Sequence, residues 1–500
     1  MKKVKYILAS LVLASSLTLT SCSDDFLDTT PTSEIGDVTA YSTGENLMTI
    51  INGMHRNMYV RQNSSQGQNG YTAQLIVSDV LGEDVIFPTQ GNGWFVSTLR
   101  WLDINNESSG NISYPWNFWY SMMRNANNVI AYGQEAGGNQ TLKNNAIGQA
   151  HAFRAFAYFQ LVQLYADRYV AGQANNQMGV VLRLDPSPEL MEERKARATV
   201  EETYAQIWSD LDKAEQLLTG VSRLHGSHFG TSNVLGLKAR VSLVQQNYQK
   251  AAEYANLARR GYSLMPLEDY TKGFNDFTNR EWMWGITIQD DQSDFFGNFH
   301  AYMSRNYNST QIRQAPKVIN KLLFDAFPAS DVRTQVVDPT GQHPDLGLAT
   351  SYSKFPYTSQ KFLTKNRDNN TALGDVPFMR VAEMYLIEAE AKYFLGDEAG
   401  SKALLTELTL ARNPEFTGFT TSGQSYLDEL YLHRRMELWG EGFRFFDLKR
   451  TNSPLNRRNT GAVAAVINNL WEVPATDLRW TWVIPRSELN SNPLVIQNPS

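Results

Sequence analysis

The chain has 500 residues, of which 42% are apolar and 12% are aromatic. It is long enough for more than one domain, although its parts could equally interleave into one. Its 45 lysines and arginines against 51 aspartates and glutamates give a net charge of −6. Without a dense basic patch, this balance disfavours nucleic-acid binding. One cysteine cannot build a disulfide framework.

The N-terminus has the pattern of a bacterial lipoprotein signal. Lysines among the first five residues precede an apolar run from Ile7 to Leu19, which is too short to span a bilayer comfortably. Leu19 lies three residues before Cys22, and a small residue directly precedes that cysteine. We therefore expect a signal peptide over 1–21, a diacylglycerol on the Cys22 thiol and an acidic, lipidated tether over 22–40. Several acyl chains together would make a durable anchor.

After the tether, helical spacing of apolar residues dominates the chain. Alanine stripes in two segments let paired helices approach closely, as in tetratricopeptide hairpins. The expected helical pairs are 41–60 with 116–132, 148–166 with 200–218, the two halves of 231–262, and the two halves of 381–412. A generic helical bundle is the alternative, but several similar units favour a stacked array.

The predicted fold is therefore mainly α, with a scaffold of about four tetratricopeptide-like hairpins, a loop-rich, irregular ligand-binding face and little β structure. Residues 41–500 would form a single domain. Its N-terminal part, about 41–265, and its C-terminal part, about 266–500, are expected to interleave.

Aromatic residues gather in two regions, 87–120 and 270–307. Part of this density is explained by packing. Trp282 and Trp284 alternate with smaller residues in a strand pattern, so both are expected in the core. Trp116 likewise falls at helical spacing and is interpreted as a packing residue.

The remaining aromatic residues stand in loops beside amides and glycines. A sugar presents a flat C–H face and a rim of hydroxyls, so its sites pair an aromatic platform with short polar groups. Local packing is the alternative for each residue, and a peptide-binding surface would look alike. The candidate ligand-binding residues are Trp94, Phe295, Phe296 and Tyr302 as aromatic groups, with Asp84, Asn92 and Asn298 as polar partners.

Catalytic and metal-binding signatures are weak. The sequence has no HExxH, GxSxG, GxxxxGK[ST] or GxGxxG motif, so we expect no enzyme, although a paired-carboxylate glycosidase stays open. His225 and His228 lack a third metal ligand nearby and are expected in a solvated loop. The stretch 290–294 offers acidic oxygens to calcium without the spacing of an EF-hand. No other cofactor is expected.

The charged segment 433–450 is expected to form one helix. Glu437 shares a face with Arg434 or Glu441, and Arg444 and Asp447 lie one turn further along. Such an array could be catalytic. The interleaved large apolar residues favour a fixed ion network that locks this helix against the repeats.

With this segment, the chain resembles the SusD/RagB family of surface nutrient-binding lipoproteins. His433 departs from the family's usual glutamate, and Arg412 lacks the usual neighbouring arginine. The matching pieces follow the family order nearly end to end: 22–28 with Pro31, 116–127, 153–161, 197–214, 377–390, 434–450 and 484–499.

The resemblance implies four tetratricopeptide-like hairpins that carry a loop-rich ligand face. It also implies a non-enzymatic protein, lipid-anchored on the outer face of the outer membrane. Such a protein captures a glycan and delivers it to its partner, a SusC-type TonB-dependent transporter. Some relatives handle peptides, so a peptide-derived nutrient is the alternative, and a surface glycoside hydrolase is a third. The matching motifs are structural and do not identify the ligand.

Overall fold

A computed structural model describes residues 37–186, 193–294 and 297–500. The predicted signal peptide, Cys22 and most of the tether lie outside the described residues. The described chain is mainly helical, and its longest strands, β2 (Trp282–Ile286) and β6 (Val376–Arg380), have five residues each. The predicted mainly α fold with little β structure is confirmed.

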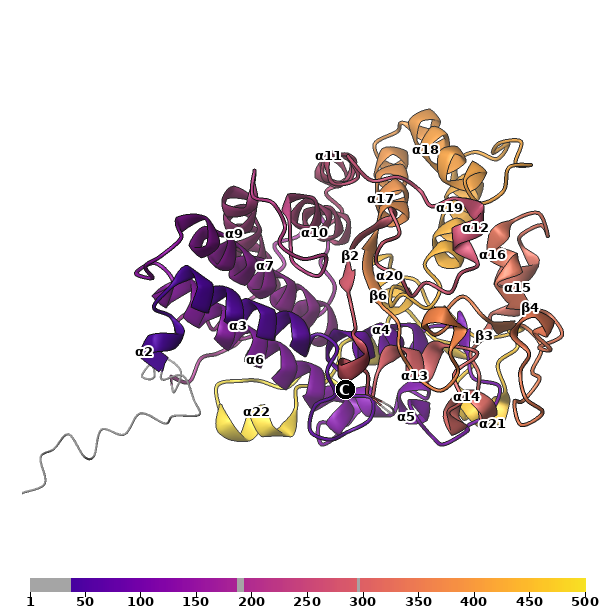
Figure 1. Ribbon diagram of the computed structural model, residues 1–500, viewed down its shortest axis with the longest axis horizontal. Coiled ribbons are helices and arrows are strands. Elements are labelled where there is room, and N and C mark those ends of the chain that lie inside the picture. Colours follow the sequence, from indigo (N-terminus) through magenta and orange to yellow (C-terminus); the bar gives the residue numbers. More distant parts are fainter. Residues whose placement is uncertain (1–36, 187–192, 295–296) are drawn as a thin grey trace, which may run out of the picture.

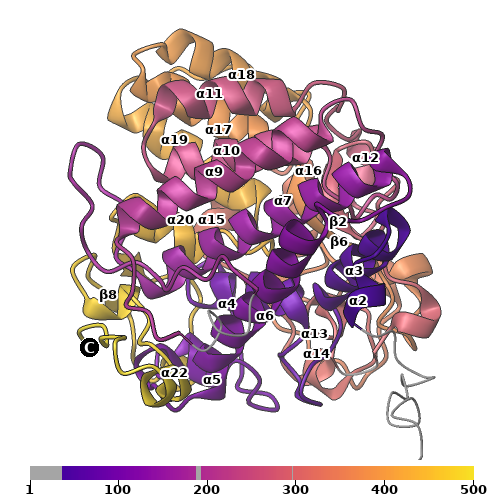
Figure 2. The ribbon, with the colours of Figure 1, turned by 90° about the vertical axis from the view of Figure 1, so that its left-hand side faces the viewer.

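Long helices packed in consecutive pairs form the scaffold. The pairs stack in chain order, because α6 also contacts α7, α9 contacts α10, and α11 contacts α17. Figure 1 shows this order from the indigo α3 on the left to the orange α18 at the upper right, and Figure 2 shows α11, α10, α9 and α7 as successive layers. The pairs are α3 (Gly44–Asn57) with α6 (Gly110–Tyr132), α7 (Gln140–Tyr165) with α9 (Val200–Leu218), α10 (Thr231–Val244) with α11 (Tyr248–Ala258), and α17 (Val381–Phe394) with α18 (Glu398–Leu410).

Local sequence explains where these helices begin and how closely they pack. Thr199 and Glu202 form a capping box at the start of α9, in which each side chain accepts from the other residue's backbone N–H. In α11, Ala251, Ala255 and Ala258 are fully buried, so this helix lies close to its neighbours. Three of the four expected pairs pack extensively, whereas α3 contacts its expected partner α6 less than it contacts α7.

Two scaffold helices begin earlier than predicted. Helix α7 starts at Gln140 because the Asn139 side chain caps it, accepting from the backbone N–H groups of Thr141 and Leu142. Helix α6 starts at Gly110 and tolerates Pro115 in its second turn. Proline removes one helix hydrogen bond there but does not end the helix.

Short antiparallel sheets join distant parts of the chain. Strand β2 pairs with β6, and Trp282 and Trp284 are buried, as the alternation predicted. Met283, on the opposite side of β2, is buried as well, so both faces of this strand are covered. The other strands are β1 (Val85–Ile86), β3 (Val318–Ile319), β5 (Thr358–Ser359) and β4 (Val337–Asp338) in one sheet, and β7 (Leu455–Asn456) with β8 (Glu472–Val473) in another.

The remaining helices and loops complete the fold, several of them below the C-terminal helix pairs in Figure 1. They bring the candidate residues together. Their bounds are α2 (Asp37–Ala40), α4 (Gly70–Val80), α5 (Val96–Leu99), α12 (Leu267–Tyr270), α13 (Phe299–Met303), α14 (Thr310–Gln314), α15 (Lys321–Asp325), α16 (Val332–Gln335), α19 (Gln424–Glu437), α20 (Arg444–Arg450), α21 (Ala464–Ile467) and α22 (Arg486–Ser491).

The prediction of one continuous helix over 433–450 is wrong, because α19 and α20 are separated by a turn. Gly440 and Gly442 have φ values of +79° and +85°, which residues with a side chain rarely adopt. A Cβ on Gly442 would lie 2.7 Å from the Cα of Leu75, so the turn also packs too closely for a larger residue.

The predicted ion network in this region is confirmed. Arg412 donates hydrogen bonds of 2.8 Å to Glu281 and 3.0 Å to Glu437, and all three side chains are fully buried. Burial alone would raise the pKa of Glu437, but the surrounding arginines outweigh it and hold the pKa well below its usual range. The network therefore stays charged and joins the segment after α18, the residue before β2 and the end of α19.

Candidate ligand-binding face

The loop before α5 supplies the first aromatic residue of the candidate face. Gly91 and Gly93 have φ values of +49° and +83°, and the Gly93 N–H donates to the Gln90 carbonyl at 2.8 Å. These glycines permit a tight turn, because residues other than glycine rarely adopt such φ values. The turn leaves Asn92 exposed and Trp94 half-buried at its end.

The second aromatic residue comes from α13. The Tyr302 ring centroid lies 5.2 Å from that of Phe95, at nearly a right angle, and 6.3 Å from that of Trp94. Tyr302 is only 3% exposed, so it supports the two loop residues from beneath. We call Trp94, Phe95 and Tyr302 the aromatic cluster. Trp94 and Tyr302, predicted from separate regions, therefore meet in space.

The segment between β2 and α13 is tied to the C-terminal end of α3. The Tyr59 hydroxyl donates to the Gln292 Oε1 at 2.6 Å, and the Arg61 Nε lies 2.9 Å from an oxygen of Asp294. A Cβ on Gly297 would lie 2.4 Å from the Arg61 Cδ, so glycine allows this close approach. These contacts hold the segment beside the start of α13.

Asn298 caps α13. Its Oδ1 accepts from the Ala301 N–H at 3.0 Å, its Nδ2 donates to the Asp294 carbonyl at 2.8 Å, and the residue is buried. The expected ligand contact does not fit these surroundings, because the amide is already engaged. Phe295 and Phe296 lie outside the described residues, so their stacking role stays a prediction.

Asp84 also has a structural role. Its two carboxylate oxygens accept from Arg435 at 2.6 and 3.0 Å, and one of them also accepts from Asn320 at 3.2 Å. Burial would raise the pKa of Asp84, but the Arg435 charge outweighs it and lowers the pKa. The expected contact of Asp84 with a ligand therefore has to be corrected: the side chain is buried in a charged pair that joins two chain segments.

Asn92 and Gln311 are the amides beside the aromatic cluster. The Asn92 N–H lies 3.4 Å from the Gln311 Oε1, while the Gln311 Nε2 has no hydrogen-bond partner among the described residues. The exposed Asn92 side chain makes no hydrogen bond within that part of the chain either. Sequence reasoning missed Gln311, because nothing local connects α14 with the turn at Gly91.

A cavity of about 610 Å³ lies next to the segment at Gln292. His225, on its wall, is exposed, but His228 is buried and stacks on His55 at 4.7 Å. The expectation of a solvated loop is therefore wrong for His228. Burial, with a smaller effect of the His225 charge, lowers the pKa of His228 to about 4.

Within 37–186, 193–294 and 297–500, no three His, Cys, Asp or Glu side chains are grouped so as to hold a metal ion. The calcium site considered at 290–294 stays a prediction. In the same ranges, no helix has both the length and the apolar character needed to cross a membrane.

Two family models match the chain. Residues 25–243 match a SusD-like model described as starch-binding and associating with the outer membrane, and residues 331–500 match the SusD family model. The chain belongs to the SusD/RagB family. Its outer-membrane association is thus a property described for the family that it belongs to.

Other SusD/RagB proteins resemble this chain along nearly its whole length. SusD-like protein P38 of Formosa agariphila is 22% identical over 100% of this chain and 99% of its own. A SusD-like carbohydrate-binding protein from Bacteroides vulgatus is 25% identical, with a TM-score of 0.79 over 91% of this chain and 98% of its own. A laminarin-binding SusD-like protein shares the fold at 19% identity. Its TM-score is 0.70, over 92% of this chain and 100% of its own.

The SusD/RagB motif residues in this chain support the scaffold. Arg154 pairs with Asp210 at 2.7 Å between α7 and α9, and Arg434 pairs with Asp447 at 2.8 Å between α19 and α20. All four side chains are buried. The family motifs thus fix the helices, whereas the aromatic cluster is built from the loop before α5 and from α13, which the motifs do not include.

Proposed function

We propose that this SusD/RagB protein binds a glycan on the face around the aromatic cluster. The proposal rests on the meeting of Trp94 with Tyr302 beside the amides of Asn92 and Gln311. The C–H face of a sugar ring would stack on the half-buried Trp94. Its hydroxyls would then exchange hydrogen bonds with the exposed amide of Asn92, whose side chain is unbonded in the described part of the chain.

The proposed role is binding without hydrolysis, followed by delivery to a SusC-type TonB-dependent transporter. Two carboxylates near this face are engaged in ion pairs, Asp84 with Arg435 and Asp294 with Arg61, which does not favour them as a catalytic pair. Lipid on Cys22 would hold the protein at the outer membrane, facing the exterior. Family membership supports both the location and the partner.

Calorimetric titration of the mature protein against plant, microbial and host glycans tests the binding. Once a ligand is found, Trp94→Ala should weaken it about tenfold or more, because a stacking platform is lost. Trp208→Ala is the matched control, since Trp208 is equally half-buried but lies on α9 of the scaffold. Equal affinity of the Trp94→Ala variant and the unchanged protein would place the site elsewhere.

Two further outcomes separate the alternatives. A protein that ignores every glycan but retains oligopeptides, as detected by mass spectrometry, would be a peptide-binding member of the family. Release of reducing ends from a polysaccharide would show a hydrolase. For the partner, the lipidated protein is solubilised from outer membranes and purified, and we expect a TonB-dependent transporter to copurify.

A further inference from the structure

A second concave site lies away from the aromatic cluster. It has a volume of about 400 Å³, within the roughly 300–1,000 Å³ common for small-molecule pockets. Three segments line it: the loop 167–177 after α7, the end of α20, and 475–481 after β8. None of its lining residues belongs to the aromatic cluster. Figure 2 places β8 at the left edge and α13 and α14 toward the lower right.

The pocket contains a buried ammonium group. The Lys449 Nζ donates hydrogen bonds of 2.7 Å to the carbonyls of Gln163 and Ala166 at the C-terminal end of α7. These two bonds leave one N–H of the ammonium group without a partner among the described residues. Burial, with a smaller opposing effect from Asp167, lowers the pKa of Lys449 to about 7. Its charge is therefore poorly compensated within the protein.

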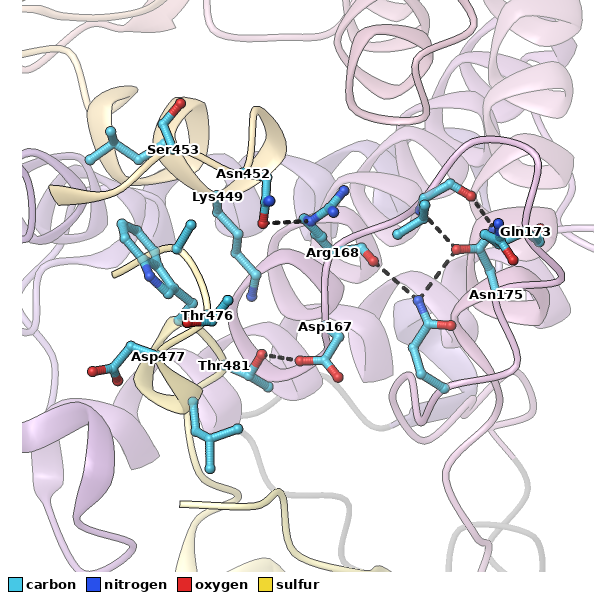
Figure 3. A pocket seen from close by; sticks show the side chains of 16 residues that line it. Asp167, Arg168, Gln173, Asn175, Lys449, Asn452, Ser453, Thr476, Asp477 and Thr481 are labelled. Carbon is cyan, nitrogen blue, oxygen red and sulfur yellow. Dashed lines mark hydrogen bonds between the residues drawn. The ribbon is translucent and has the colours of Figure 1, made fainter. Parts of the chain in front are cut away.

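The positively and negatively charged side chains that line the pocket lie on different sides of it. Figure 3 shows Arg168 and Asn452 on one side of the pocket, Asp167 and Thr481 on the other, and Lys449 between them. The Arg168 Nε donates to the Asn452 Oδ1 at 3.2 Å, which leaves its terminal nitrogens unbonded in the described part of the chain. Asp167 accepts from the Thr481 hydroxyl at 2.6 Å, and its second oxygen has no partner there.

The wall of the pocket is preformed. The Asn175 Oδ1 accepts from the Val170 N–H at 2.9 Å, and its Nδ2 donates to the carbonyls of Val170 and Gln173. Asn175 is buried, so these bonds fix the loop that carries Arg168. A fixed loop lowers the entropy cost of binding a small ligand.

We propose that this pocket binds an anionic sugar, which is a polyhydroxylated ring carrying a carboxylate or a sulfate group. The anionic group lies between Lys449 and Arg168, where charge-assisted hydrogen bonds are available. The hydroxyls face Asp167 and Thr481, because a carboxylate accepts from hydroxyls but repels an anion. Asp477 does not oppose the ligand, since both its oxygens are bonded to Arg479.

A purely structural explanation for Lys449 is that it caps α7. A cationic group at a helix C-terminus is favourable, and the two carbonyl contacts fit that role. Capping does not explain why Arg168, whose terminal nitrogens are unbonded in the described part of the chain, lines the same pocket. Because Lys449→Gln would remove the cap and destabilise the protein, Arg168 is the better position for a test.

The experiment is a calorimetric titration of the mature protein at pH 6 with glucuronate, glucose 6-sulfate and glucose. We expect both anions to bind and glucose to bind at least about tenfold more weakly. Arg168→Gln should weaken the anions about tenfold. Arg458→Gln, which removes an exposed arginine paired with Glu472 near β8, should leave them unchanged. Titration with a uronate tetrasaccharide then shows whether the pocket accepts the end of a chain or only a free monosaccharide.

The pH dependence supplies a readout that a structural role would not change. The groups facing Lys449 are the α7 carbonyls, Asp167, Arg168 and the Asp477–Arg479 pair, and no histidine of the described ranges lines the pocket. Affinity for glucuronate should therefore fall about tenfold from pH 6 to 8, as Lys449 loses its proton.

Three results would overturn the proposal: equal binding of glucose and the anions, no binding of either anion at millimolar concentration, or no effect of Arg168→Gln. Trp94→Ala should leave this binding intact. The proposal for this pocket can therefore be refuted without refuting glycan binding at the aromatic cluster.

Discussion

Arg380 donates a hydrogen bond of 2.8 Å to the carboxylate of Glu437, and neither side chain has any exposure to solvent. Arg380 ends β6 and Glu437 ends α19, so the pair joins the small β2–β6 sheet to a helix 57 residues later. A charge in such a place is tolerated only while its partners are present.

Glu437→Gln should therefore destabilise the protein strongly. We expect the free energy of unfolding to fall by about 3–5 kcal/mol, because buried arginines would lose a compensating charge. Urea unfolding at pH 7, followed by tryptophan fluorescence, measures this. The control is Asp325→Asn, which removes the exposed ion pair with Lys321 and should leave the midpoint unchanged. Similar midpoints for both variants would contradict the expectation.

Acid should weaken the contact of α20 with its neighbours. Burial would raise the pKa of Asp447, but Arg434 and Arg450 outweigh it and lower the pKa from 3.8 to about 2. A carboxyl whose pKa is lowered by folding stabilises the protein above its unfolded pKa, and this contribution is lost as the pH falls from about 4 through about 2.

The measurement compares the unchanged protein with Asp447→Asn at several pH values. The difference in unfolding free energy should shrink by about 2 kcal/mol as the pH falls from 5 towards 2. The same comparison with Asp345→Asn, at an exposed position, should show no trend. A constant difference for Asp447→Asn would show that its charge does not stabilise the fold.

The loop bearing Trp94 should be sensitive to one glycine more than to its neighbour. A Cβ on Gly91 would lie 2.7 Å from the Cβ of Ala315, whereas a Cβ on Gly93 meets nothing within 4 Å. Both have positive φ, so each alanine variant carries backbone strain of about 1 kcal/mol.

Gly91→Ala should therefore cost more stability than Gly93→Ala, and it should also displace the turn and weaken glycan binding. Thermal unfolding and calorimetric titration of the two variants provide the comparison. If Gly93→Ala is equally harmful, backbone strain alone determines the effect and docking against α14 is irrelevant.

The predicted lipid anchor has a direct test. Cys22→Ala should move the protein from the membrane pellet to the supernatant after fractionation, because the residue that takes the acyl chains is lost. Ser23→Ala, at the adjacent position, should still pellet. A Cys22→Ala protein that stays with the membranes would contradict the lipid assignment.

Features decided by nearby residues could be predicted from the sequence. The bounds of α9 match the prediction because its apolar spacing and the capping pair of Thr199 and Glu202 are local. The hairpin of α10 and α11 was predicted for the same reason. The break between α19 and α20 was not, because the glycines there are needed partly for a contact with Leu75, far away in the chain.

The candidate face could be predicted only in part. Loop composition indicated Trp94 and Tyr302, but not that the two rings meet. It also suggested Asp84 as a ligand contact, since a sequence does not show that its carboxylate faces Arg435 across 351 residues. A sequence shows the chemical type of each side chain, whereas the folded structure decides which distant side chains pair with one another.

Three carboxylates at the end of α4 and in the turn after it have their partners near the other end of the chain. Asp79 accepts from the Gly442 N–H, Glu83 from Arg444, and Asp84 from Arg435, across 351 to 363 residues. Contacts this distant require large loops to close and form slowly. A chain made from its N-terminus therefore completes its first third only after its last helices exist. Synthesis of nearly the whole chain thus becomes part of the folding time.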